Sequence, residues 1–295
     1  MITEIFTANY EMNYQLVRIA LALLGTGIAS YFDIFNKKNV PDKLLFGFLA
    51  LSLIVAVADF GQLMVYSLAI TILIGGLGYL MYRTGQMGAA DILILMSLCL
   101  LLPVQTTLIE KSAPMFKLPF IFSIIVVSGL LFMIYVFAKF TPKIIDAVKK
   151  KRHKLSAQQI MYVFFLLAVY VFFVYLGTQA PIFTTNYLAL VGILIFASMY
   201  FTLFKDIIQD SMTEDMDVKK IGDQEVIAIE KLDPDLVKKN GIPRVFREAD
   251  RARLIKAGMH KLPVYTGLPM FLPFIFLAVI VVLFTGDIIQ FMAGW

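Results

Sequence analysis

Four aspartates lie inside or at the ends of long apolar segments, where an ionisable side chain is costly and therefore a candidate for function. They are Asp33, Asp59, Asp91 and Asp287. Asp33 ends the first apolar segment and Asp91 begins the fourth, so a chain that runs up and down brings both to one face. Two carboxyl groups about 3 Å apart share one proton. Such a pair activates water with its ionised member and polarises a peptide carbonyl with its neutral member, which is the chemistry of an aspartic protease.

Small residues surround both aspartates and allow helices to approach closely. They are Gly25, Gly27, Ala29 and Ser30 before Asp33, Gly75, Gly76 and Gly78 in the third segment, and Gly85, Gly88, Ala89 and Ala90 before Asp91. Either aspartate taken alone has a simpler interpretation, because an aspartate at a helix end most often caps the helix. The pairing hypothesis therefore depends on the elements that position the two residues.

The composition is that of a membrane protein with several spans. Hydrophobic residues make up 60% of the 295 residues and charged residues only 16%, whereas a soluble domain has about 25% charged residues. The mean hydropathy is +0.82. We expect an all-α polytopic protein with about eight (six to eight) transmembrane helices. The predicted spans are 13–32, 43–58, 61–82, 91–103, 118–139, 160–177, 187–204 and 268–286.

Three regions follow from this division. Residues 1–204 form a transmembrane core with extra helices, residues 205–262 a small soluble cytoplasmic domain, and residues 268–286 the last transmembrane helix. Basic residues gather in alternate loops, as the positive-inside rule requires. The cytoplasmic loops hold Lys37, Lys38, Lys43, Arg83 and the run from Lys139 to Lys154, whereas the outer loops hold only Lys111 and Lys117. We expect both termini outside the cytoplasmic membrane, with Asp33 and Asp91 at its inner face.

The segment 205–262 contains 12 of the 21 acidic residues. Asp206, Asp210, Glu214 and Asp217 are spaced by 4, 4 and 3, which on a helix makes one acidic stripe. This stripe is either a solvated face or a surface that attracts the basic leader of a precursor. A helix is expected from Asp233-Pro234, and another over 243–258 with Arg244, Arg247 and Arg251 on a solvated or membrane-facing side. The segment is short for a core of its own, so we expect it to lean on the membrane part.

Two motifs carry a resemblance to a known family. The stretch from Ser30 to Asp42, which includes Asp33, Lys37, Lys38 and Pro41, resembles the signature after the first helix of prepilin peptidases. Gly88-Ala89-Ala90-Asp91 resembles their GxGD motif, with Ala90 in place of the second glycine. The separation of 58 positions between the aspartates, with two helices between them, also resembles that family's order. The chain is thus similar to the prepilin and preflagellin (archaellin) peptidases over about residues 14–139, and weakly over 268–286.

This resemblance implies a GxGD-type membrane aspartic protease that removes the short basic leader, a class III signal peptide, from type IV pilin-like or archaellin precursors. With Cys99 as its single cysteine, the chain lacks the cysteine-rich domain of the methylating members and resembles the archaeal, non-methylating branch. We expect no cofactor, no metal and no nucleic-acid partner; membrane lipids are the other partner, and the oligomeric state stays open. The alternatives are a transporter that moves protons or cations with the same aspartates, a relative of signal peptide peptidase whose motifs are absent here, and a scaffold.

Overall fold

Eight long helices occupy the eight predicted spans in the computed structural model, which describes residues 12–36, 40–106, 108, 118–150, 156–179, 185–223, 225–266 and 269–286. They are α2 (Gln15–Phe35), α3 (Asp42–Ala58), α4 (Gln62–Arg83), α5 (Ala89–Leu101), α6 (Phe120–Lys149), α7 (Ala157–Thr178), α8 (Thr185–Met212) and α11 (Leu272–Thr285). Helices α2, α4, α6, α7 and residues 191–212 of α8 are long and apolar enough to cross a membrane, while α5 and α11 are shorter apolar helices. The prediction of an all-α polytopic membrane protein is confirmed.

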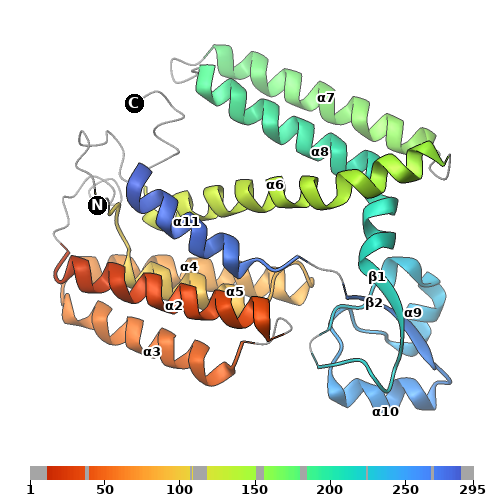
Figure 1. The fold of residues 1–295 in the computed structure, drawn as a ribbon, viewed down its shortest axis with the longest axis horizontal. Helices are drawn as coiled ribbons and strands as arrows, with labels where there is room; N and C mark the ends of the chain where they lie inside the picture. Colours follow the sequence, from red (N-terminus) through yellow and green to blue (C-terminus); the bar gives the residue numbers. More distant parts are fainter. Residues whose placement is uncertain are drawn as a thin grey trace.

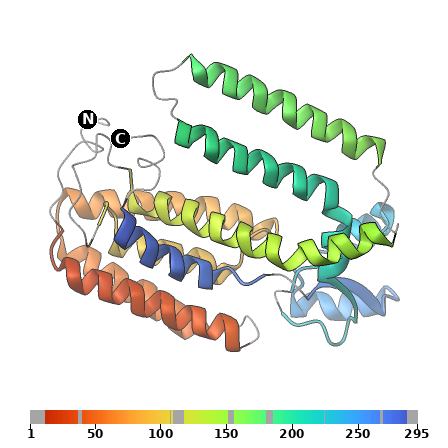
Figure 2. The ribbon, with the colours of Figure 1, turned by 45° about the horizontal axis from the view of Figure 1, so that its top comes forward.

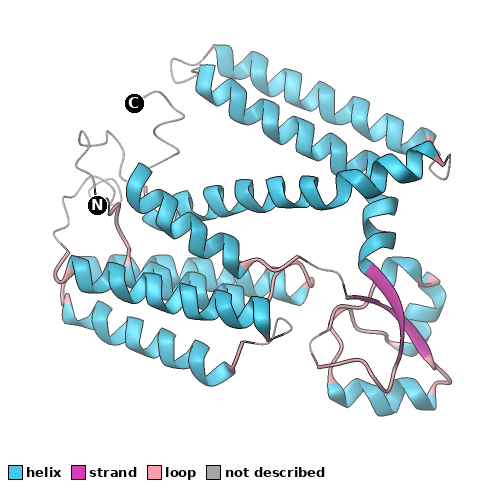
Figure 3. Ribbon diagram, viewed as in Figure 1, coloured by secondary structure: helices cyan, strands magenta, loops and turns pink. Residues whose placement is uncertain are grey.

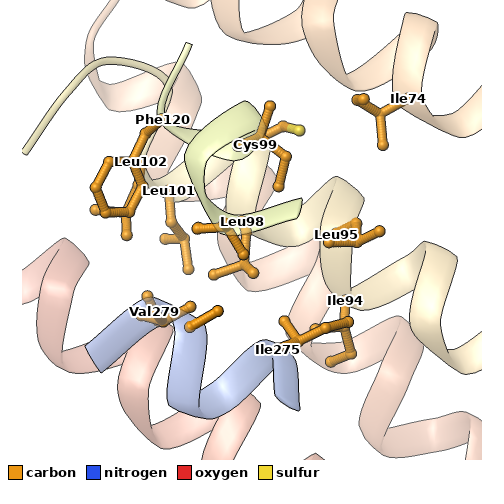
Figure 4. Close-up of a cluster of buried hydrophobic side chains, with 14 of the residues drawn as sticks. Ile74, Ile94, Leu95, Leu98, Cys99, Leu101, Leu102, Phe120, Ile275 and Val279 are labelled. Atoms are coloured by element: carbon orange, nitrogen blue, oxygen red, sulfur yellow. The ribbon is translucent and has the colours of Figure 1, made fainter. Parts of the chain in front are cut away.

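Helix α5 lies inside a bundle built from α2, α3, α4 and α11 (Figures 1 and 2). It packs against α3 and α4 along most of its length and also contacts α2 and α6, while α11 packs between α2 and α6. The core consists of apolar side chains from α5 facing α11 and the start of α6 (Figure 4). Leu98, Leu101 and Phe120 are almost completely buried there. This packing surrounds the short helix that begins beside Asp91.

Helices α7 and α8 form a hairpin that stands apart from this bundle (Figure 1). The hairpin contacts the rest through α8, which packs against α6. Phe137, Phe140 and Tyr200 form the centre of that contact. Most side chains of α7 are apolar and exposed, as expected of a helix surrounded by lipid.

Glycines let neighbouring helices of the bundle touch, as predicted from the small residues. A Cβ atom added to Gly25 would lie 2.1 Å from the ring of Phe48 on α3, and one added to Gly27 would lie 3.3 Å from Phe276 on α11. On α4, Gly78 faces Ile92, and a Cβ atom added to this glycine would lie 2.7 Å from Ile92 Cγ2. Gly76 differs, because no heavy atom lies within 4 Å of its Cβ position. The contact at Gly78 sets the position of the residue next to Asp91.

We expect Gly78→Ala to lower stability by about 1–3 kcal/mol, the usual cost of overpacking, because β-branched Ile92 cannot turn away without moving α5. Gly76→Ala is the matched control on the same helix and should change little or stabilise slightly. Thermal unfolding in detergent, followed by circular dichroism, measures both. Equal stability of the two variants would contradict the close α4–α5 contact.

Helix α6 continues ten residues beyond its predicted end at 139 and ends at Lys149. The basic residues at its end are therefore on a helix, not in a loop as expected. Phe140 and Ile144 are buried against α8 and keep the helical face continuous. Lys139 and Lys143 lie 5.5 and 5.6 Å from the ring centre of Phe140, within range of cation–π attraction.

The segment after α8 forms a small unit beyond one end of the bundle (Figures 1 and 3). Strand β1 (Thr213–Asp217) pairs antiparallel with β2 (Lys261–Tyr265), from Thr213 opposite Tyr265 to Asp217 opposite Lys261. Between the strands lie η1 (Ile229–Lys231), α9 (Pro234–Asn240) and α10 (Glu248–Lys256). Asp233 caps α9 by accepting from the N–H of Asp235, as predicted from the Asp-Pro pair.

Three expectations for this small unit were wrong. It has a core of its own, in which Val218, Ile221, Ile227, Phe246, Leu254, Leu262 and Val264 are completely buried. Helix α8 continues to Met212 and the chain then turns into β1, so Glu214 and Asp217 lie on a strand and the four acidic residues form no single helical stripe. Helix α10 begins only at Glu248, which leaves Arg244 outside it. The pairing of β1 with β2, which are more than forty residues apart, explains why the expectations about the core and the acidic stripe were wrong. Local helical spacing carries no information about a distant partner strand.

Candidate active site

Asp33 lies in the last turn of α2 and is buried, with 6% of its surface exposed. One turn earlier, Ser30 ties α2 to the last helix, since its hydroxyl lies 2.7 Å from Thr26 O and 3.0 Å from Leu272 O of α11 and can donate to either. The backbone N–H of Asn36 donates to Phe32 O and closes the helix. The carboxyl group is therefore held at a helix end that is packed on both sides.

Asp91 is the third residue of α5, and its carboxylate turns back to the start of that helix. Its Oδ2 accepts the backbone N–H of Gly88 at 3.1 Å, the bond expected between a residue at this position and the helix N-cap. A Cβ atom on Gly88 would lie 3.1 Å from the same oxygen. Gly88 thus donates a hydrogen bond to the carboxylate of Asp91 and, having no side chain, leaves space for it. Ala89 and Ala90 add only small side chains to the first turn of α5.

Asp33 and Asp91 lie at the ends of two helices that pack against each other, Asp33 in the last turn of α2 and Asp91 in the first turn of α5. The end of α2 and the start of α5 are at the end of the bundle that faces the small unit (Figure 1). A pair of neighbouring carboxyl groups with limited access to water retains a shared proton, which is the state required for acid–base attack on a peptide bond.

Residues 20–137 of the chain match the type IV leader peptidase family. They include both aspartates and run from the second turn of α2 to a point just past the middle of α6. The matched part is less than half of the chain, and it supports the similarity to the prepilin peptidases that the two motifs indicated. Members of this family are endopeptidases of the aspartic type, and the match supports an enzyme of that kind. No curated protein and no solved structure matches the chain significantly.

The family match covers only part of the chain. It confirms the resemblance inferred from the two motifs in residues 14–139, and it ends before α7, α8, the small unit and α11. The weak resemblance over 268–286 has no counterpart in the match. The parts outside it nevertheless contact the site, because Leu272 O of α11 lies 3.0 Å from the hydroxyl of Ser30.

The motif residues other than the aspartates fall into two groups. Pro41 precedes α3 and its carbonyl accepts the backbone N–H groups of Leu44 and Leu45, so it starts the second helix close to the end of the first. Lys37 and Lys38 lie outside the described residues. Asp287 also lies outside them.

Asp59 has a partner that the sequence did not predict. It forms an ion pair with Arg18 at 2.6 Å, in which the two side chains are 4% and 1% exposed. Arg18 also donates to Val55 O and to the carbonyls of Leu100 and Leu101. These oxygens lie at the ends of α3 and α5, where helix carbonyls lack partners. The signal that could have revealed this pair is a lone arginine within an apolar span.

The four acidic residues proposed for substrate binding have different surroundings. Asp206 accepts from Gln159 Nε2 at 3.1 Å, and Asp210 pairs with Lys231 at 2.6 Å. Glu214 and Asp217 are exposed on β1, where Asp217 accepts the N–H of Lys219. Among the described residues, no group of three or more His, Cys, Asp or Glu side chains offers a set of metal ligands.

Proposed function

We propose that Asp33 and Asp91 are the catalytic pair of this peptidase, and that it removes the leader from a pilin-like or archaellin precursor at the cytoplasmic face of the membrane. The observation that carries the proposal is the place of the two aspartates, one in the last turn of α2 and one in the first turn of α5, on helices that pack against each other. The family supports pilin-like precursors as substrates. The non-methylating, archaeal branch remains the proposed relative, because the chain has one cysteine.

The proposed reaction needs only the pair and one water. The ionised carboxylate takes a proton from water, whose oxygen attacks the scissile carbonyl carbon, while the protonated carboxyl group donates its proton to the carbonyl oxygen. The tetrahedral diol then collapses as its C–N bond breaks: the leaving nitrogen receives the proton held by the first aspartate, and one hydroxyl group of the diol returns its proton to the second aspartate, which restores the pair. The products are the leader with a free carboxylate and the mature protein with a free amine.

The proposed orientation supports this location. Lys43 at the start of α3 and Arg83 at the end of α4 lie at the same end of the bundle as the end of α2 and the start of α5, which carry the aspartates. Basic residues favour the cytoplasmic side. The junction between a basic leader and an apolar helix in a precursor lies at the membrane surface. Carboxyl groups at helix ends, near that surface, can reach such a junction without a charge crossing the bilayer.

Co-expression of the peptidase with pilin-like and archaellin precursors tests the function. Cleavage should appear as a faster-migrating band for at least one class, with a new amino terminus just before the apolar helix. A precursor with a shortened apolar helix serves as a control for recognition. Failure to cleave either class in membranes that contain folded peptidase would refute the proposed substrate.

Activity should decline on both the acidic and the alkaline side of an optimum, because the pair works with one proton. Acid adds a second proton and removes the base, and alkali removes the shared proton and with it the acid. Initial cleavage rates at several pH values, in detergent and at constant ionic strength, measure this. A rate unchanged from about pH 4 to pH 10 would contradict a coupled pair.

Asp206, Asp210, Glu214 and Asp217 remain the proposed contact for the basic leader. Asp206 and Asp210 have side-chain partners within the chain, whereas Asp217 accepts a backbone N–H. We therefore expect Glu214→Lys with Asp217→Lys to raise the Michaelis constant more than reversal of the other two. Turnover should change little, since charge complementarity acts on encounter and specificity. The effect should shrink in salt, which screens exposed charges beyond about 8–10 Å. A precursor with a neutralised leader is the control, and equal kinetics on both precursors would exclude the contact.

A further inference from the structure

Arg244 of the small unit lies directly against the loop between α4 and α5. Gly85 in that loop has a φ of +69°, a left-handed conformation that favours glycine. A Cβ atom there would lie 3.2 Å from Arg244 Nε and 3.3 Å from its Cγ and Cδ. The side chain of Arg244 therefore lies along the backbone of Gly85, and a larger residue at 85 would push it away.

The other side of Arg244 is held by the small unit. Its carbonyl accepts the N–H of Ile227 at 2.8 Å, and the next residue, Val245, forms a β-bridge with Val226. Its Nη1 lies 3.8 Å from Glu230 Oε2. Glu230 in turn accepts the hydroxyl of Tyr265; burial and this bond raise the pKa of Tyr265, so it remains a donor. The arginine is thus anchored in β-structure rather than on a mobile helix face.

The loop that Arg244 contacts leads directly to Asp91. The N–H of Gly85 bonds to Tyr82 O and that of Gln86 to Met81 O, which closes the end of α4. Two residues later, Gly88 donates to the carboxylate of Asp91. A displacement of Gly85 therefore passes through a short connection to the donor that holds Asp91.

One donor of Arg244 is available at this contact. Its Nε is buried and has no hydrogen-bond partner among the described residues, and it is the atom of Arg244 closest to the Cβ position of Gly85. A buried donor without an acceptor costs free energy. The arrangement therefore favours donation to a neighbouring carbonyl, of the loop itself or of a bound peptide backbone, when the site is occupied.

We propose that Arg244 is a positioning residue of the peptidase: it holds the α4–α5 loop and thereby keeps Asp91 in place for reaction with Asp33. This inference rests on the proposed function of the two aspartates. It gives the small unit, which lies outside the family match, a role in the reaction. A misplacement of about 1 Å at a reacting group can lower a rate about 100-fold, so a contact outside the reacting atoms is sufficient to affect turnover.

Arg244→Met and Arg244→Lys in the full-length peptidase test the proposal. Methionine keeps an apolar stem but removes the guanidinium group, and should lower kcat about tenfold or more with a Michaelis constant within about twofold of the original. Lysine keeps a stem against Gly85 and a charge near Glu230, so it should recover part of kcat. Arg253→Met is the matched control, because Arg253 bonds to Asp250 and Gly241 O inside the small unit; its kinetics should be unchanged.

Hydrogen exchange of residues 84–92, measured by mass spectrometry in detergent, reads the loop directly and needs no substrate. Exchange there should become faster in Arg244→Met and stay as in the original protein in Arg253→Met. Unchanged exchange in Arg244→Met would overturn the proposal, and so would faster exchange with unchanged kcat. If the original protein cleaves no precursor, the proposed function fails, while the exchange result still decides whether Arg244 holds the loop.

Discussion

Asp33→Asn and Asp91→Asn should each abolish cleavage of a precursor, with rates at least about 100- to 10,000-fold lower than the original. Asparagine is close to aspartate in shape, but it neither takes a proton from water nor passes one to the scissile carbonyl. Asp33 is buried at a helix end and Asp91 accepts the N–H of Gly88, so an amide at either place disturbs packing little. The measurement is single-turnover cleavage by purified peptidase variants at matched amounts.

Asp42→Asn is the matched control for this pair. Asp42 is the first residue of α3, is exposed, and lies on the chain only nine residues after Asp33. Its replacement should leave the rate within a few-fold of the original, while expression and thermal unfolding stay alike in all three variants. Cleavage that persists in both Asp33→Asn and Asp91→Asn would overturn the assignment of the pair.

Arg18→Met should be the most destabilising single change at the end of the bundle opposite the two aspartates. It leaves the carboxylate of Asp59 buried without its partner, which typically costs about 3–5 kcal/mol. It also removes the donors to Val55 O, Leu100 O and Leu101 O, by which α2 holds the ends of α3 and α5. We expect the Tm in detergent to fall by roughly 10 °C, measured by circular dichroism.

The double variant Arg18→Met, Asp59→Leu separates the ion pair from the packing. It removes both charges, so it should be more stable than Arg18→Met alone, because a buried pair replaced by apolar residues often costs little. Arg83→Met, a basic residue at the end of α4, is the control for the loss of one arginine. If Arg18→Met unfolds at the same temperature as the original, the ion pair does not stabilise the bundle.

Hydropathy and local spacing were sufficient for the helices. Long uncharged runs predict spans because a helix satisfies its own backbone hydrogen bonds in lipid, and each predicted span corresponds to a helix. Local capping chemistry was equally readable, as at Asp233 before α9. The end of α6 could not be predicted from the sequence. Lysines in a sequence indicate the boundary of a membrane span, but α6 extends beyond them because Phe140 and Ile144 are buried against α8.

The two motif aspartates could also be read from the sequence, because alternation of spans places the end of the first and the start of the fourth at one face. The small residues around them pointed to close packing, which Gly25, Gly27 and Gly78 show. Gly76 is also a glycine, but no heavy atom of a neighbouring helix lies within 4 Å of its Cβ position. Residue type reports what a position permits, and the rotation of each helix decides whether a neighbour uses it.

The sequence by itself thus determined that the chain is a helical membrane protein with one aspartate at the end of its first span and another at the start of its fourth, because hydrophobicity and helix period are local properties. Only the tertiary structure paired Arg18 with Asp59, joined β1 to β2 and laid Arg244 on Gly85. Each of these contacts joins residues at least forty positions apart. Such contacts depend on how packed elements are oriented and registered, and a single sequence carries that information only through the free energy of the whole fold.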